Sequence, residues 1–177
     1  WHSDAGADAQ IAWRQAILRL YRVTIAWLIV MALAAWHFST RTRPDAAVRA
    51  LLFIVALGYL IFMALLAVFD QWVTPSISPY LLGCVSVSLL LLLPPASAVG
   101  SMLLAYAVFF VGLGFTQPDE TLLLTNRTNG FGATLLALVM SLTMWNRNTR
   151  YRLLQRELTE RNATLEQQQT DLVWLAT

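Results

Sequence analysis

A few polar side chains at the borders of long apolar segments have the residue types and spacing for chemistry. Arg127 lies between two asparagines in the stretch Thr-Asn-Arg-Thr-Asn-Gly, residues 125–130. A guanidinium group binds a carboxylate or a phosphate through two parallel hydrogen bonds, and we expect the neighbouring amides to orient such a ligand. We therefore hypothesise a pocket for a small anionic or amphiphilic ligand. Its candidate residues are Arg127, Asn126, Asn129, Asp70, Asp119, Glu120 and Tyr80.

Arg127 has a second interpretation, in which it fixes a loop and binds no ligand. A charge beside hydrocarbon is costly and usually finds a partner. Asp70, Asp119 and Glu120 all lie at the borders of apolar segments, so each is a possible salt-bridge partner for Arg127. The sequence leaves the ligand pocket and the salt bridge open as alternatives.

Catalysis and metal binding find no support in the sequence. His2 and His37 are the only histidines, and the predicted helix places them near opposite faces of a membrane. Cys84 is the only cysteine, so an intrachain disulfide is excluded. No nucleophile stands beside a base, and no Gly-rich phosphate loop is present. We therefore predict no catalytic residue and no metal ligand in this chain.

The helices that position these residues can be predicted from the segments that contain no charged residue. The chain has 177 residues, of which 58% are hydrophobic and 12% charged, whereas an ordinary soluble domain is about 25% charged. A helix needs about 17–25 apolar residues to cross a bilayer. Four long windows contain no charged residue, and Pro94-Pro95 divides the longest of them. We predict an all-α membrane protein with a bundle of about five transmembrane helices. The predicted spans are residues 23–38, 47–69, 80–93, 97–115 and 130–145.

The chain divides into three regions on this pattern. Residues 1–22 form an N-terminal amphipathic segment that either lies at the membrane interface or continues into the first span. We expect residues 23–146 to form the five-span membrane domain and residues 147–177 to form a charged helix. The twelve basic residues, all arginine, are spread over the borders of these regions and form no single basic face, which argues against nucleic-acid binding.

The arginines also predict an orientation in the membrane. Five spans place the two ends of the chain on opposite sides. A cytoplasmic C-terminus puts eight arginines inside and four outside, and the reverse orientation inverts these numbers. The positive-inside rule therefore favours a cytoplasmic C-terminus.

The region 147–177 contains no glycine or proline and carries the pattern of a parallel dimeric coiled coil. Its seam residues alternate at spacings of three and four, which is the period of a two-stranded coiled coil. We expect this cytoplasmic signalling helix to continue directly from the fifth span. An amphipathic tail helix packed on something else is the alternative. The seam residues are Tyr151, Leu154, Leu158, Arg161, Leu165, Gln168, Leu172 and Leu175.

The C-terminal part of the chain is similar to a pattern found in a known family. The similarity rests on the stretch 125–130, Trp145, the arginine-rich helix and the final Leu-Ala-Thr of residues 175–177. They resemble the N-terminal multi-span membrane sensor region of bacterial GGDEF-type diguanylate cyclases, most clearly over residues 121–177. The resemblance implies a homodimer whose output domain, after this chain, binds GTP and magnesium and makes cyclic di-GMP. It implies no cofactor in this region itself. Membrane histidine kinases have similar input regions, so a kinase sensor region is the second interpretation.

We therefore expect a membrane sensory input module that perceives a signal at the outer face or in the bilayer. It transmits this signal through the last span and a dimeric coiled coil to a cytoplasmic output domain. The expected partners are the lipid bilayer, a second copy of the chain and a small anionic or amphiphilic ligand. A small transporter is less favoured, because residues 71–118 carry no charge and no repeat of broken helices is evident. The polar stretch 116–129 argues against a structural anchor without a ligand.

Overall fold

The computed structural model describes the backbone of residues 3–39 and 46–176, and the side chains of residues 10–38 and 46–168. This described part contains helices and their connections, and no strand. The all-α prediction is therefore confirmed. The helices are α1 (Ser3–Ser39), α2 (Ala46–Asp70), α3 (Ser78–Leu90), α4 (Pro95–Thr116) and α5 (Glu120–Ala176).

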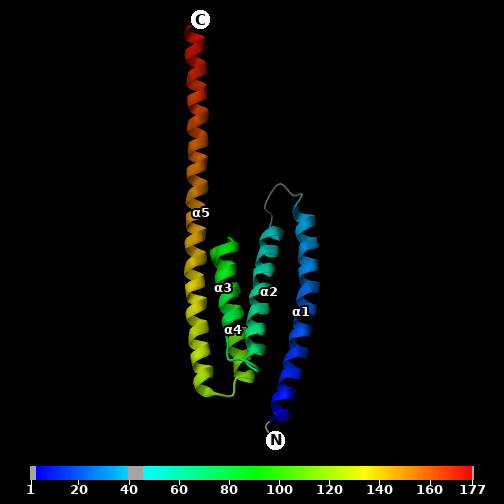
Figure 1. Ribbon diagram of the computed structural model, residues 1–177. Helices are drawn as coiled ribbons and strands as arrows, with labels where there is room; N and C mark the ends of the chain where they lie inside the picture. Colours follow the sequence, from blue (N-terminus) through cyan, green and yellow to red (C-terminus); the bar gives the residue numbers. More distant parts are fainter. Residues whose placement is uncertain (1–2, 40–45, 177) are drawn as a thin grey trace.

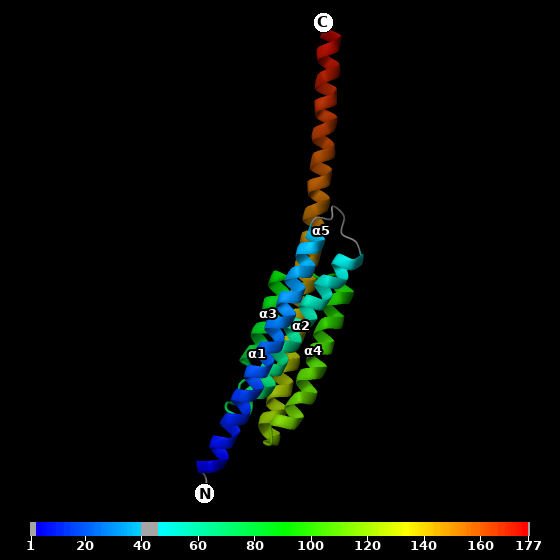
Figure 2. The same cartoon turned by 90° about the vertical axis from the view of Figure 1, so that its right-hand side faces the viewer.

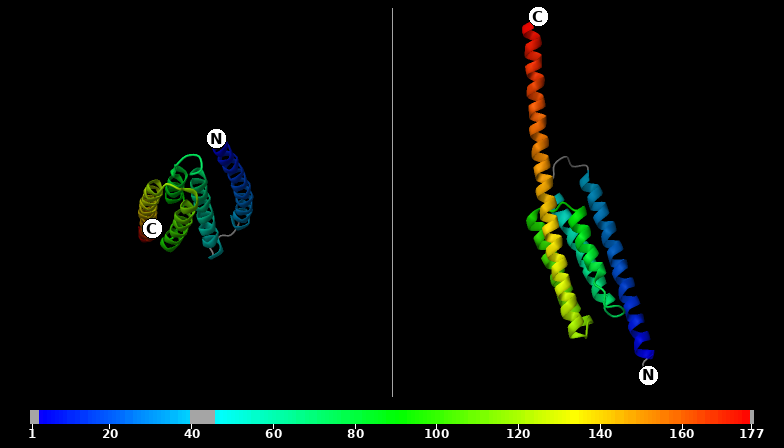
Figure 3. Two further views of the ribbon diagram at one scale, coloured as in Figure 1. Left: turned by 90° about the horizontal axis from the view of Figure 1, so that it is seen from below. Right: turned by 60° about the vertical axis from the view of Figure 1, so that its left-hand side comes forward.

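Four of the helices form a bundle, and α1 packs on its outside. Helices α2 and α5 each contact both α3 and α4, so α3 and α4 lie between them. Helix α1 packs along α2, at the edge of the bundle that lies away from α5 (Figures 1 and 3). The two ends of the chain lie at opposite ends of the molecule (Figure 1). Because the helices that contact α5 lie on one side of it, its opposite edge stays uncovered by the other described helices.

The bundle core combines small residues on α2 with two large aromatic rings. Ala56 and Ala64 of α2 are fully buried and let the neighbouring helices approach closely. Tyr80 of α3 stacks on Phe109 of α4, with ring centroids 4.2 Å apart and an interplanar angle of 7°. Gly130 brings α5 against this stack, because a Cβ at this position would lie only 3.0 Å from Cδ1 of Phe109. The core thus holds α3, α4 and α5 in one arrangement.

Three helices are long and apolar enough to cross a membrane, namely Gln10–Phe38 within α1, Ala46–Asp70 and Pro95–Thr116. By length and composition, these helices associate the chain with a membrane. Helix α3 is a shorter apolar helix of 13 residues, about 20 Å long, against about 30 Å of bilayer hydrocarbon. The sequence-based number of about five spans exceeds these three by α3 and the first part of α5.

The predicted break at Pro94-Pro95 separates α3 from α4, as expected for residues that cannot continue a helical hydrogen-bond ladder. Helix α3 ends at Leu90, a little before the predicted end of the third span near residue 93. Leu93 is buried between the two helices, so this connection packs against the core.

The amphipathic segment and the first predicted span form one continuous helix, α1, with no boundary near residue 22. The helix is thus continuous from the amphipathic segment into the apolar one. Trp27 of α1 lies directly over Gly58 of α2, where a side chain would overlap the indole ring. Nearer the start of α1, Nε1 of Trp13 donates a hydrogen bond to the Asp70 carboxylate at 3.2 Å. These contacts attach α1 to α2 at two heights.

Helix α5 begins at Glu120, not near residue 130 as the sequence suggested for the fifth span. The reason is a cap at its first turn. The backbone N–H groups of Thr121 and Leu122 donate to Oδ1 of Asp119 at 2.8 and 3.0 Å, which satisfies two donors that have no partner inside the helix. The polar stretch 116–129 is therefore helical from residue 120 onward.

The C-terminal half of α5 leaves the bundle and continues as a single helix (Figures 1 and 2). The whole helix has 57 residues, which corresponds to about 85 Å. Every described side chain from Thr149 to Gln168 is exposed. The backbone of Leu172 and Leu175 continues the helix, whereas their side chains lie outside the described residues. The seam residues Tyr151, Leu154, Leu158 and Leu165 are 57–61% exposed.

Candidate functional site

A buried amide, the side chain of Gln71, joins three helices at the end of the bundle opposite the C-terminus. Its Nε2 donates to the carbonyl oxygens of Ala67 and Ser76 at 3.2 and 3.0 Å. Its Oε1 accepts hydrogen bonds from Nε2 of Gln117 and from Nδ2 of Asn126, both at 3.0 Å. A glutamine side chain offers two donors and two acceptor positions. All four are used here.

Gln71, Gln117 and Asn126 are called the amide cluster below. They are 8%, 8% and 6% exposed, respectively. They come from the residue after α2, the residue after α4 and the second turn of α5. A buried polar network that is fully hydrogen-bonded fixes the groups that form it. The cluster therefore ties the start of the long helix α5 to the ends of α2 and α4.

The sequence-based candidate list contained Asn126 but neither Gln71 nor Gln117. A signal for the two glutamines exists, because each is a polar residue just past the end of a long apolar segment, Gln71 after Asp70 and Gln117 after Thr116. The last carbonyls of a helix need partners outside the helix, and a side-chain amide at that position can supply one. Such a pattern indicates a cap but does not reveal which helices its other groups join.

Arg127 points to the outer surface of α4. Its Nε and Nη2 donate to the carbonyl oxygen of Phe110 at 3.2 and 3.0 Å, and its Cζ lies 3.9 Å from the centre of the Phe110 ring. Gly114 leaves room for the guanidinium, since a Cβ there would lie 2.9 Å from Nη2. The backbone carbonyl of Arg127 accepts a hydrogen bond from the Tyr106 hydroxyl at 3.2 Å. Asn126 and Arg127 thus lie on different faces of α5, one directed to the amide cluster and the other to the surface of α4.

The three carboxylates proposed as partners of Arg127 have other positions in the described part of the chain. Asp70 accepts the indole N–H of Trp13, and Asp119 caps α5. Glu120 is exposed in the first turn of α5. Within the described residues, none of the three forms a salt bridge with Arg127. The structure therefore separates the guanidinium from the acidic side chains.

The remaining two candidates, Tyr80 and Asn129, differ in burial. Tyr80 is fully buried, and its hydroxyl lies 2.7 Å from Oγ1 of Thr134, which in turn donates to the Gly130 carbonyl at 2.7 Å. Tyr80 therefore connects α3 to α5 inside the core. Asn129 is exposed on α5, and none of the described residues hydrogen-bonds its side chain. The anionic-ligand hypothesis for these residues stays a prediction.

An open pocket of about 370 Å³ lies directly beside the amide cluster. It lies between the first half of α1 and the ends of α2 and α4. A ligand in this pocket would contact Gln71. It could therefore alter the hydrogen bond between Gln71 and Asn126 of α5. Its lining residues are Ala12, Gln71, Trp72, Thr116 and Pro118.

Metal-binding residue types are dispersed in the part of the chain that the structure describes. Among the described residues, no group of three His, Cys, Asp or Glu side chains is placed to hold a metal ion. Comparisons with known protein families, with curated proteins and with solved structures give no match to this chain. Its function is therefore inferred from its own geometry.

Proposed function

We propose that this chain is the sensory input module of a dimeric membrane signalling protein. The single observation that carries the proposal is the continuity of α5. This helix starts beside the amide cluster, runs along the bundle core and continues beyond the bundle from about residue 147 to Ala176, a distance of about 45 Å. A rigid helix that joins a buried polar cluster to a distant end is suited to transmit a small displacement.

The exposed half of α5 supports a homodimer. Leu154, Leu158 and Leu165 lie on one stripe of a helix that has no packing partner in the described part of the chain. Helices in proteins gain most of their stability from packing of an apolar face. A second, parallel copy covers this stripe with identical residues at identical heights. The polar positions Arg161 and Gln168 weaken the seam, which favours a helix pair that can change its packing.

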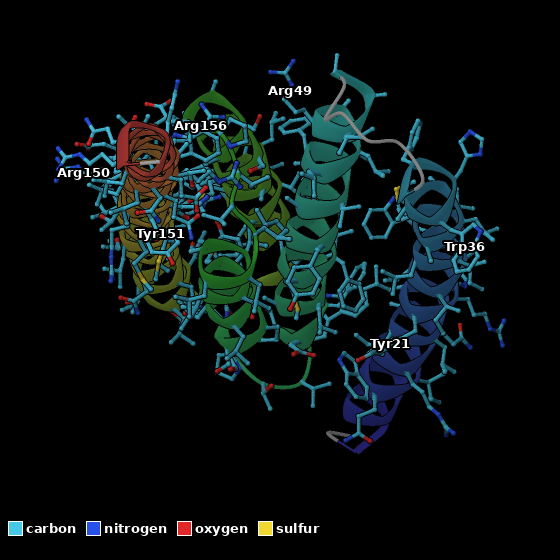
Figure 4. The ribbon with its side chains drawn as sticks, turned by 90° about the horizontal axis from the view of Figure 1, so that it is seen from above. Tyr21, Trp36, Arg49, Arg150, Tyr151 and Arg156 are labelled. Carbon is cyan, nitrogen blue, oxygen red and sulfur yellow. The ribbon has the colours of Figure 1, made fainter. Side chains whose placement is uncertain are left out.

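The arrangement of arginines supports a cytoplasmic C-terminus. Arg49 on α2 lies at the end of the bundle from which α5 emerges, and Arg150 and Arg156 follow on α5 (Figure 4). The three arginines of α1 lie in its N-terminal part, and Arg41 and Arg43 lie outside the described residues. We include α3 and the first part of α5 among the spans, which gives five. The positive-inside rule then favours an orientation with the output domain inside, and the resemblance favours a bacterial inner membrane.

The signal is proposed to act at the amide cluster, on the outer side of the membrane. A ligand shifts a conformational equilibrium only by binding two states unequally. The pocket beside Gln71 offers such a difference, because a ligand that engages it favours one arrangement of α2, α4 and α5. The residues that line this pocket carry no charge, so of the small anionic or amphiphilic molecules expected from the sequence, we propose an amphiphilic one for this pocket.

The proposed output is a diguanylate cyclase domain that binds GTP and magnesium and makes cyclic di-GMP. The resemblance over residues 121–177 supports this part of the proposal. Full-length protein in membranes, supplied with GTP and magnesium, is expected to form cyclic di-GMP. Phosphorylation of a histidine from ATP, without cyclic di-GMP, would replace this output by a kinase.

Disulfide cross-linking tests the dimer directly. In a Cys84→Ala background, Leu158→Cys is expected to give a cross-linked dimer on oxidation of native membranes, because the seam places this residue opposite its copy. Arg156→Cys, on the far side of the same helix turn, is the matched control and is expected to stay monomeric on a denaturing gel. Equal cross-linking at both positions, or none at Leu158→Cys, contradicts the proposal.

A further inference from the structure

Part of α5 inside the bundle exposes a face that the other described helices leave open. Leu136 is 59% exposed, Asn129 and Thr143 are exposed, and Ala133 and Met140 are only half-buried. Next to them, Gly132 is so open that a Cβ added there would meet no atom within 4 Å. In the views from the side and from below, α5 forms the edge of the bundle opposite α1 (Figures 1 and 3). A further helix therefore has room on this side.

This face is aligned with the coiled-coil seam. An α-helix has 3.6 residues per turn, so residues 18 apart lie directly above one another after five turns. Ala133, Leu136 and Met140 lie 18 residues before Tyr151, Leu154 and Leu158. The exposed face within the bundle and the exposed seam beyond it are thus one continuous stripe on α5.

The seven-residue spacing of the coiled-coil seam changes once where the stripe passes from the part of α5 outside the bundle to the part inside it. A strict seven-residue repeat, continued from Tyr151 toward the start of α5, leads to Ala137 and Gly130, which are buried in the bundle core. The exposed stripe instead has two successive steps of four, from Thr143 to Arg147 and from Arg147 to Tyr151. Such a four-residue insertion locally unwinds a coiled coil. Because of this insertion, the seam continues along the outer side of α5 and not along the side that faces the bundle core.

We infer that two copies of this chain pack α5 against α5 within the bilayer, along Asn129, Ala133, Leu136, Met140 and Thr143. This interface continues the coiled-coil seam without a gap, and it rests on the homodimer of the proposed function. It extends that proposal from the part of α5 outside the bundle to the part inside the membrane.

Asn129 argues for a second copy as the occupant. It lies nine residues after Glu120, about 14 Å along the helix, at a depth where an amide gains from a partner. A two-fold axis places each residue opposite its own copy, and an amide can both donate to and accept from an identical amide. Ala133, one turn on, has a small side chain and permits close approach of two backbones. The hydroxyl of Thr143 already donates to the Val139 carbonyl at 2.8 Å and needs no partner.

Cross-linking of the full chain in native membranes tests this interface, again in a Cys84→Ala background. Leu136→Cys is expected to form a dimer on oxidation. Leu135→Cys is the matched control, because it is similarly exposed, at 47% against 59%, yet lies about 100° around the helix. Adding Asn129→Leu to Leu136→Cys is expected to lower the cross-linked fraction about threefold through loss of the amide pair, whereas Asn129→Gln retains it.

The outcomes separate this inference from the proposed function. Cross-linking at Leu158→Cys without cross-linking at Leu136→Cys overturns the membrane interface and leaves the coiled coil. Absence of cross-linking at both positions overturns the dimer itself. Equal yields at Leu135→Cys and Leu136→Cys indicate random collision and also overturn the interface.

Discussion

Replacing Gln71 with leucine is expected to lower the free energy of unfolding of the bundle by about 3 kcal/mol. The substitution removes the acceptor of Gln117 and Asn126 and the donor to the carbonyls of Ala67 and Ser76. The two amides then remain buried without their partner, and an unsatisfied buried polar group costs about 1–3 kcal/mol. Unfolding of the purified protein in mixed micelles, followed by circular dichroism, measures this loss.

The triple variant Gln71→Leu, Gln117→Leu, Asn126→Leu is the control for this explanation. It removes all three members of the amide cluster together, so no amide of the cluster remains buried and unpaired. Replacing both partners of a hydrogen bond by apolar groups can be nearly neutral. The triple variant is therefore expected to be more stable than Gln71→Leu alone. A triple variant that is less stable than the single one would show that leucine packs badly there and that unpaired amides are not the cause.

Gly130→Ala is expected to destabilise the bundle by about 2 kcal/mol, although alanine favours helix formation. The added Cβ overlaps the edge of the Phe109 ring. That ring is fully buried and stacked on Tyr80, whose hydroxyl is in turn hydrogen-bonded to Thr134. The ring has no free space to move into, so α5 must shift away from α4. The same unfolding measurement reports the effect.

Two further variants make this second result specific. Gly132→Ala, two residues on, adds a Cβ that meets no atom within 4 Å and is expected to be neutral or slightly stabilising. Phe109→Leu removes the ring edge, so its combination with Gly130→Ala is expected to cost less than the sum of the single changes. Equal losses for Gly130→Ala and Gly132→Ala would refute the role of the close contact.

The sequence predicts the helices well because the signals for them are local. The absence of charges locates the apolar segments, and Pro94-Pro95 separates two of them whatever they pack against. The start of α5 is harder to predict, since its cap depends on where the carboxylate of Asp119 points. With this cap at Asp119, α5 begins at Glu120, about three turns before the predicted start near residue 130.

The candidate site depends on contacts between distant residues, which a single sequence does not encode visibly. Asn126 and Arg127 are neighbours in the chain, but adjacent helical residues point about 100° apart. One therefore reaches the buried Gln71 and the other reaches the surface of α4. Gln71 and Gln117 lie 46 positions apart and meet only because α2 and α4 pack side by side.

The proposed signalling role depends most on the parallel pairing of α5, and distances between spin labels measure that pairing directly. Labels are placed singly at Thr149, Arg156 and Ala163, which lie one heptad apart on the outer face of the predicted coiled coil. The measurement uses the full chain with Cys84→Ala in lipid bilayers, read by pulsed electron resonance. The parallel dimer predicts the same interlabel distance at all three positions. Three distances that change steadily along the helix would indicate an antiparallel pair, and the absence of any defined distance would indicate a monomer. Either result contradicts the parallel dimer.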